Sequence, residues 1–162
     1  MSEQLEEKLG ILLREWGWTI AVAETTTGGV ISARIVSVPG SSAYYERGVI
    51  AYSALSKREM LGIDVQVMDT YGAVSAEAAC EMARGVRKVS GADLGLAETG
   101  IAGPIRGRSP KPIGTAYIAV AGAEGVVCRD FQFDGDRDAI RNAIADAALQ
   151  MVIEAGKKAI DN

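Results

Sequence analysis

The sequence predicts an α/β fold, a three-layer α/β/α sandwich around a mixed, mostly parallel five-stranded sheet. Apolar strand patterns alternate with helical patterns along most of the chain, which is typical of parallel βαβ units. The last two strand patterns are separated only by residues 122–124, a turn short enough for an antiparallel hairpin. A long helical pattern over 136–157 comes next. We expect residues 1–162 to form one domain with a sizeable core.

The five predicted strands are short runs rich in apolar and β-branched residues. The first of them, WTIAVA, has the composition of a buried strand and is followed at once by a turn. Because ligands of such sheets bind at the carboxyl ends of the parallel strands, the turns after the first three strands form the candidate site. The strands are predicted over residues 18–23, 45–53, 93–99, 113–121 and 125–133.

The helices are predicted where apolar residues recur three and four positions apart. The first begins near Leu5 and ends at Gly17, and Ser2 has the side chain of an N-cap. Ser75 is the predicted N-cap of a longer helix whose apolar residues share one face. The other helices are predicted over residues 30–36, 55–61, 65–71 and 136–157.

Composition and charge exclude several classes of protein. Hydrophobic residues make up 48% and charged residues 23% of the chain, as in an ordinary globular protein. With a net charge of −4 and no run of Lys and Arg, nucleic acid is not expected as a partner. The chain has no histidine, so a base must be Lys, Asp, Glu or Tyr. The apolar surroundings of Cys80 and Cys128 favour buried free thiols over a disulfide.

The beginning of the chain and its hydropathy indicate a cytoplasmic location. The first residues, MSEQLEEKLGILLREWG, are acidic and amphipathic, unlike a signal peptide. No apolar run reaches the length that crosses a bilayer, so no membrane association is expected. No acidic cluster has metal-ligand spacing, and we predict neither a metal nor a cofactor.

Two turns combine glycines with hydroxyl side chains directly after predicted strands. The first, residues 24–29 (ETTTGG), exposes backbone amides at the start of a helix, where an anion binds well. Its Thr25 could act as a nucleophile beside a suitable base, although Thr and Gly also cap helices without any ligand. The second turn, residues 99–104 (TGIAGP), lets the backbone approach a ligand closely, or merely reverses the chain.

Lysine is the candidate base in a chain without histidine. Tyr52 and Ser53 end the second strand, and Lys57 comes four residues later. Burial would lower the pKa of this amine and suit it to deprotonating a hydroxyl, whereas an arbitrary helix lysine is simply solvated. Arg106 and Arg108 could reach a phosphate or remain in a solvated loop. Asp136, Arg137 and Arg141 have the positions of caps and surface charges at the start of the last helix.

These motifs together resemble a known family, the CinA C-terminal domain of competence/damage-inducible proteins, also found alone as a nicotinamide mononucleotide deamidase. The family's AESCTGG stands here as AETTTGG, its GVVAYS as GVIAYS, and its KPVGT as KPIGT. Its TGIAGP, GAVS and GDR segments are present unchanged. The resemblance covers nearly the whole chain but not the amino-terminal domain of full-length members, which resembles a molybdopterin-binding domain. The similar segments are residues 23–29, 48–53 with Lys57, 72–75, 99–104, 111–115 and 135–137.

The resemblance implies an amidohydrolase that converts nicotinamide mononucleotide to nicotinic acid mononucleotide in pyridine nucleotide recycling. By position it makes Thr25 the nucleophile, Lys57 the base and Tyr52 the accompanying tyrosine. The substrate phosphate would bind amides of the two glycine-rich turns, where donors could also form an oxyanion hole. Family members also suggest a homo-oligomer. The substrate-binding positions that the resemblance implies are Glu24, Thr27, Gly28, Gly29, Ser42, Thr99, Gly100, Ala102, Gly103 and Arg137.

Two departures from the family pattern bear on the chemistry of the site. The nucleophilic serine is Thr25 here, which keeps the oxygen but adds a methyl group and stiffens the side chain. The loop after Pro104 carries Ile105-Arg106-Gly107-Arg108 in place of the usual Asp and Gly. The alternative function is therefore a catalytically inactive CinA-like domain that binds a nucleotide or a partner. A purely structural subunit is a third alternative, which would leave both turns without a role.

Overall fold

The computed structural model describes residues 4–162, which form six α-helices, one 3₁₀ helix and five strands. Ser2, the predicted N-cap, lies outside the described residues, and α1 begins after Gln4 without a side-chain cap. The elements in chain order are α1 (Leu5–Trp16), β1 (Ile20–Glu24), α2 (Val30–Val36), η1 (Ser41–Ala43), β2 (Tyr45–Ile50), α3 (Ala54–Leu61), α4 (Val65–Tyr71), α5 (Ala76–Ser90), β3 (Leu94–Gly100), β4 (Thr115–Gly122), β5 (Gly125–Gln132) and α6 (Arg137–Asp161).

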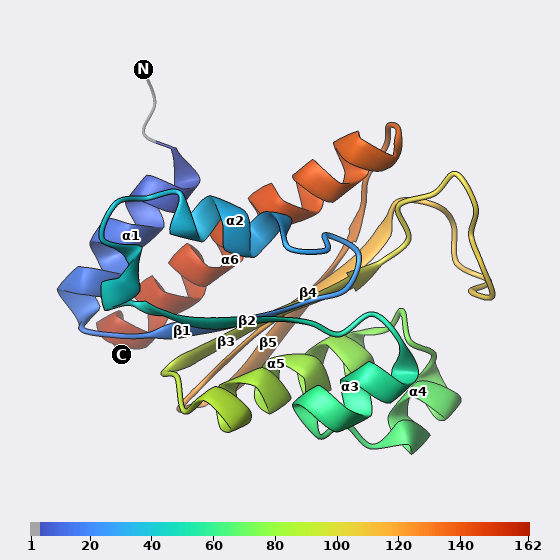
Figure 1. Cartoon of the computed structure of the whole chain (residues 1–162), viewed down its shortest axis with the longest axis horizontal. Coiled ribbons are helices and arrows are strands. Elements are labelled where there is room, and N and C mark those ends of the chain that lie inside the picture. The colour runs from blue at the N-terminus through green and yellow to red at the C-terminus, as the bar shows by residue number, and fades with distance from the viewer. Residues whose placement is uncertain (1–3) are drawn as a thin grey trace.

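The strands form one mixed sheet in the order β2-β1-β3-β4-β5. β1 is parallel to both β2 and β3, whereas β4 is antiparallel to β3 and forms a hairpin with β5. The helices α1, α2 and α6 cover one face of the sheet, and α3, α4 and α5 cover the other (Figure 1). The predicted three-layer α/β/α sandwich with one antiparallel hairpin is confirmed.

Each face of the sheet has its own core. Branched side chains such as Val22, Leu96 and Ile118 pack against α1, α2 and α6. The opposite face presents small residues, mainly alanines, to α5. A Cβ added at Gly95 would overlap the Ala83 carbonyl oxygen, so this face admits α5 very close to the sheet. Burial of apolar side chains on both faces therefore stabilises the fold although the chain has few aromatic residues.

The register of the sheet brings three turns together. Ala23 of β1 pairs with Val49 of β2 on one side and with Ala97 of β3 on the other. The three parallel strands therefore end at the same edge, where β4 begins. The long loop from residue 101 to 114 projects beyond this edge (Figure 1). Any site built from the turns after these strands must lie here.

Most strands are shorter than predicted because the local backbone turns away earlier. The second strand ends at Ile50 rather than at Ser53, since Ser53 accepts a hydrogen bond from the Ser56 amide and caps α3. The fourth begins at Thr115 rather than at residue 113, since Pro112 has no amide hydrogen and Gly114 has a φ of 93°. These differences leave Tyr52 and Ser53 in a connection rather than in the sheet.

Candidate active site

A cleft of about 510 Å³ lies at the carboxyl edge of the parallel strands. Its wall combines the turn after β1, the segment between α4 and α5, the turn after β3, the long loop and the start of α6. The cleft thus occupies the position expected for a ligand site in such a sheet. The lining residues are Thr25, Thr26, Tyr52, Tyr71, Gly72, Ala73, Val74, Gly100, Ile101, Ala102, Gly103, Ile105, Arg106, Gly107, Arg108, Ser109, Pro110, Lys111 and Arg137.

The charges around this cleft are all positive. Arg106, Arg108, Lys111 and Arg137 line it, and no Asp or Glu does so within residues 4–162. The Lys111 ammonium donates to the Val74 carbonyl and lies 4.8 Å from the centre of the Tyr117 ring. Although the chain carries a net charge of −4, the local field therefore attracts an anion.

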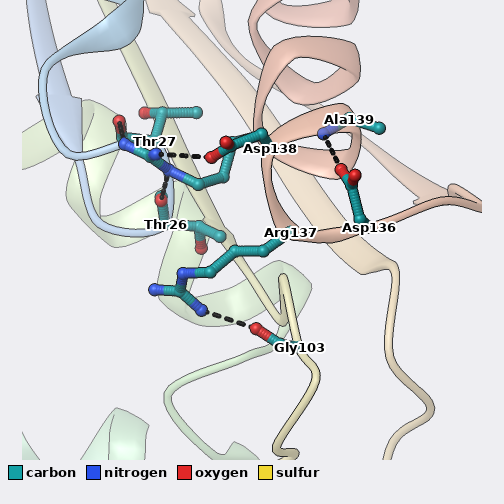
Figure 2. Close-up of polar contacts among 8 residues, drawn as sticks. Thr26, Thr27, Gly103, Asp136, Arg137, Asp138 and Ala139 are labelled. Atoms are coloured by element: carbon teal, nitrogen blue, oxygen red, sulfur yellow. Dashed lines mark hydrogen bonds and ion pairs between the residues drawn. The ribbon is translucent and has the colours of Figure 1, made fainter.

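Arg137 joins the start of α6 to the second glycine-rich turn. Its guanidinium donates to the Gly103 carbonyl at 2.8 Å, and Asp136 caps the helix through the Ala139 amide (Figure 2). The predicted capping role of Asp136 is confirmed. The prediction that Arg141 is a surface charge is wrong. Its guanidinium donates to the carbonyls of Thr26 and Thr27 at 3.1 and 2.8 Å and so braces the first turn.

Thr25 is half-buried on the wall of the cleft. Its backbone amide donates to Glu98 Oε1 at 2.6 Å, and its hydroxyl donates to the Ala51 carbonyl at 3.1 Å. The side chain also lies beside Met82 of α5, with 4.0 Å between Oγ1 and Sδ. The hydroxyl is therefore held in one orientation at a position that a ligand in the cleft can contact.

Lys57 is not a solvated helix lysine, because only 2% of the residue is exposed. Its ammonium donates to the Tyr52 carbonyl at 3.1 Å. Burial lowers the pKa of Lys57, and a negative charge on Glu98 would partly oppose this effect. The Lys57 amine and the Thr25 hydroxyl thus bond two consecutive carbonyls, those of Tyr52 and Ala51, although no hydrogen bond within residues 4–162 joins them directly.

The Tyr52 side chain behaves differently from its backbone. The residue is 66% exposed and lines the cleft, while its carbonyl holds Lys57 inside the protein. The phenol is consequently free to turn toward a bound ligand. Of the three residues predicted as catalytic, the structure brings Thr25 and Tyr52 to the cleft wall and places Lys57 behind Tyr52.

Glu24 is fully buried and ties the first turn to α2. Its Oε1 accepts from the Thr27 hydroxyl at 2.5 Å and from the amides of Gly29 and Ile31 at 3.2 and 2.9 Å. Its Oε2 accepts from both the amide and the hydroxyl of Ser32, at 3.0 and 2.7 Å. The carboxylate therefore occupies the helix N-terminus that the sequence pattern offered to a substrate anion.

Glu98 of β3 holds the other side of the same turn. Its Oε1 accepts from the amides of Thr25 and Thr27 at 2.6 and 3.0 Å and contacts the Thr27 hydroxyl at 2.9 Å. Its Oε2 is buried and has no hydrogen-bond partner among residues 4–162. Burial raises the pKa of Glu98, hydrogen bonds from Thr27 and Thr25 lower it, and the charge of Glu24 raises it further.

Four backbone amides at the first turn and the start of α2 are not available to the expected phosphate. Amides at Thr25, Thr27, Gly29 and Ile31 already donate to the chain's own carboxylates, so they are not free for a phosphate. Gly28 and Gly29 adopt positive φ angles of 59° and 109° that close the turn. The cations of the cleft and the second turn offer further means of binding an anion.

The second glycine-rich turn does reach the cleft. Gly100, Ala102 and Gly103 line it, and Gly103 has a φ of 75° before a cis peptide bond to Pro104. Thr99 instead points into the protein and donates its hydroxyl to the Ala73 carbonyl at 2.8 Å. It supports the wall formed by residues 72–74 rather than facing the cleft.

Ser42 is not brought to this site. It lies in η1, before β2 begins, whereas the cleft lies beyond the end of β2. The structure does not bring Ser42 to the cleft of the same chain, and its implied substrate-binding role stays a prediction. Its position at the opposite end of a parallel strand gives the physical reason, because that edge of the sheet is a strand length away from the cleft.

Thr26 and Glu98 are the residues that sequence reasoning missed. The Thr26 hydroxyl is buried beside the cleft and finds no hydrogen-bond partner in the part of the chain that the structure describes. One signal pointed to Glu98: the tripeptide Ala-Glu-Thr occurs twice, at 23–25 and at 97–99. Ala23 and Ala97 are register partners, so the two copies lie side by side on neighbouring strands.

The fold closely matches solved structures of one superfamily. A competence-damaged protein (CinA) superfamily protein from Klebsiella pneumoniae aligns with a TM-score of 0.92 at 28% identity, covering 95% of this chain and 96% of that one. The competence/damage inducible protein CihA from Agrobacterium tumefaciens aligns with a TM-score of 0.87 at 36% identity, covering 95% and 98%. Fold and site together define an α/β protein of the CinA superfamily.

Sequence comparisons specify the family. A model of the CinA C-terminal domain matches residues 2–155, and the chain therefore belongs to the CinA C-terminal domain family. A CinA-like protein from Geotalea uraniireducens is 45% identical over 140 residues, which are 86% of this chain and 33% of that protein. Another CinA-like protein, from Geobacter sulfurreducens, is 49% identical over 138 residues, which are 85% of this chain and 33% of that protein. The chain thus spans about a third of the length of these relatives.

The helices were compared with the length and hydropathy that a membrane-spanning helix needs. Across the part of the chain that the structure describes, none of them is both long and apolar enough to cross a bilayer. The predicted free state of the cysteines is confirmed, since neither Cys80 nor Cys128 forms a disulfide. Both thiols are half-buried rather than buried, because they lie between α5 and the edge strand β5.

Proposed function

We propose that this protein hydrolyses the carboxamide of nicotinamide mononucleotide, releasing ammonia and nicotinic acid mononucleotide. The observation that carries the proposal is the arrangement of Thr25 and Lys57. A half-buried hydroxyl on the cleft wall and a buried amine bond consecutive carbonyls. A chain without histidine needs such an amine to activate a hydroxyl nucleophile.

The lowered pKa of Lys57 suits it to the role of base. A neutral amine accepts the Thr25 proton while Oγ1 attacks the carbonyl carbon of the carboxamide. The tetrahedral intermediate then collapses with cleavage of its C–N bond, and Lys57 returns the proton to the leaving nitrogen, so that ammonia departs. Water hydrolyses the resulting threonyl ester, which releases the carboxylate and restores the hydroxyl.

The positive lining of the cleft suits the other end of this substrate. Arg106, Arg108 and Arg137 supply charge for the phosphate of a mononucleotide, and backbone groups of Gly100 and Gly103 shape the adjoining wall. Tyr52, with its exposed ring, is assigned to the nicotinamide end beside Thr25. Glu24, Thr27, Gly28 and Gly29 contribute by holding the nucleophile's turn in shape.

The direct test measures ammonia release from nicotinamide mononucleotide by the purified protein. Thr25→Ala should abolish it, Lys57→Ala should lower kcat by about a hundredfold or more, and Thr25→Ser should keep it. Ser37→Ala, which removes an exposed hydroxyl at the end of α2, is the matched control. Ammonia release by Thr25→Ala at the wild-type rate would show that this hydroxyl is not the nucleophile.

The assignment of a phosphate site is tested by comparing two substrates, with and without a phosphate. Nicotinamide riboside carries the same carboxamide without the phosphate, so it should be deamidated with a much higher KM. Equal KM values for the two compounds would refute a phosphate site in the positive cleft. If neither compound is hydrolysed but the mononucleotide binds, the chain is instead a catalytically inactive, nucleotide-binding CinA-like domain.

A further inference from the structure

Glu98 and Glu24 form an unusual pair of buried carboxyls joined through one hydroxyl. Both residues are fully buried, and the Thr27 oxygen lies 2.5 Å from Glu24 Oε1 and 2.9 Å from Glu98 Oε1. A threonine hydroxyl has a single proton, which can be donated to only one of these oxygens. With both carboxyls ionised, three oxygens would share one hydrogen, so the two short contacts favour a proton on one of the carboxyls.

The hydrogen-bond partners show which carboxyl is suited to carry that proton. Glu24 uses both oxygens as acceptors, five contacts in all, at the N-terminal end of α2. This environment favours a negative charge. Glu98 uses only Oε1, whereas Oε2 is buried without a partner. A charge on Glu98 would leave one of its oxygens neither solvated nor hydrogen-bonded, which is costly inside a protein.

We propose that Glu98 is a neutral carboxylic acid in the folded protein and that in this form it positions the nucleophile's turn, residues 25–27. The positioning part of this proposal rests on the proposed function, whereas the protonation of Glu98 does not. The turn depends on Glu98 directly, because the amides of Thr25 and Thr27 both donate to it. Burial and the neighbouring charge of Glu24 raise the pKa of Glu98, in agreement with the geometry.

The groups around Glu98 determine how its ionisation would affect the site. Glu24 of β1 would repel the new charge, and Lys57 of α3 would gain a stabilising neighbour that raises its pKa. Arg141 of α6 bonds the carbonyls of Thr26 and Thr27 rather than a carboxyl of this pair, and Ile118, the register partner on β4, is apolar. Ionisation of Glu98 would thus strain the turn and raise the pKa of the base, so activity should fall at alkaline pH.

Carbon NMR of the wild-type chain labelled at the glutamate side chains tests the protonation without any substitution. At neutral pH the Glu98 carboxyl carbon should have the chemical shift of a protonated acid. The exposed Glu124, in the β4–β5 turn of the same sample, should have that of a carboxylate. A Glu98 carbon with the chemical shift of a carboxylate at neutral pH would overturn the proposal, regardless of the result of the deamidase assay.

Two substitutions test the positioning role. Glu98→Gln imitates the neutral acid, so it should retain the deamidation rate, lose the alkaline fall of kcat/KM and keep the acidic limb set by Lys57. Glu98→Val removes the acceptor and should lower kcat/KM by about tenfold or more. Glu124→Gln is the matched control and should leave the pH profile unchanged. An alkaline fall that persists in Glu98→Gln would refute the positioning role, even with Glu98 shown to be protonated.

Discussion

The replacement of Glu24 by alanine should destabilise the protein more than loss of a surface carboxyl. Glu24 accepts hydrogen bonds from three backbone amides, those of Gly29, Ile31 and Ser32. It also accepts from the hydroxyls of Thr27 and Ser32. Alanine would remove all five acceptor contacts and leave donors at the start of α2 without partners.

The magnitude depends on how many of these donors water can reach. Ile31 is buried, so its amide keeps most of the penalty of about 1–3 kcal/mol for an unsatisfied buried group, whereas the Thr27 hydroxyl still has Glu98 Oε1 as an acceptor. Gly29 and Ser32 are half-exposed, and water replaces part of what they lose. Together these effects predict a loss of about 2–4 kcal/mol in the free energy of unfolding. Glu24→Gln keeps one acceptor but sets an amide group against the Ser32 amide, so its free energy of unfolding should lie between those of Glu24→Ala and wild type.

Urea unfolding followed by circular dichroism measures these differences as shifts of the transition midpoint. Glu124→Ala, at an exposed turn, is the control and should change stability by less than about 0.5 kcal/mol. A Glu24→Ala protein as stable as this control would refute the reasoning that Glu24 is an internal anchor. Glu24 would then be free to serve as a substrate ligand.

Three further predictions concern charges and thiols. The pKa of Lys57 is lowered in the folded protein, so the Lys57→Met protein should be more stable than wild type at neutral pH. This difference in stability should shrink as the pH rises toward the ordinary lysine pKa, and urea unfolding at several pH values measures it. Replacing both Arg106 and Arg108 by alanine should raise KM for the mononucleotide with little change in kcat; an unchanged KM in steady-state assays would remove these residues from the site. A hydrogen bond from Cys128 lowers the pKa of Cys80 to about 7, so iodoacetamide should alkylate Cys80 first, as peptide mass mapping would show.

Elements and family could be predicted because they depend on local or contiguous patterns. The alternation of strand and helix patterns correctly predicts which segments form the sheet. The short turn at 122–124 correctly predicts the antiparallel hairpin of β4 and β5. The glycine-rich turn at 99–104 was correctly expected at a strand end. The resemblance of segments such as 23–29 to the CinA pattern was confirmed by the family match.

The partners of these segments were not predictable from local patterns. ETTTGG has the composition of an anion site, and an anion is bound there, but it is the carboxylate of Glu24 from the same turn. Ser42 is close to β2 in sequence yet lies at the wrong end of that strand. Arg141 was expected in solvent because its helix begins with charged residues, but it contacts the turn.

The sequence by itself determined the order of the elements, the chemical types in each turn and the family. Only the tertiary structure decided which groups meet. The parallel register of β1 and β3 places Glu98 beside the first turn, 73 positions from Thr25 along the chain, and the packing of α3 buries Lys57 behind Tyr52. The physical reason is that burial and hydrogen-bond partners arise from contacts between distant segments, whereas a local pattern specifies only the groups available for such contacts.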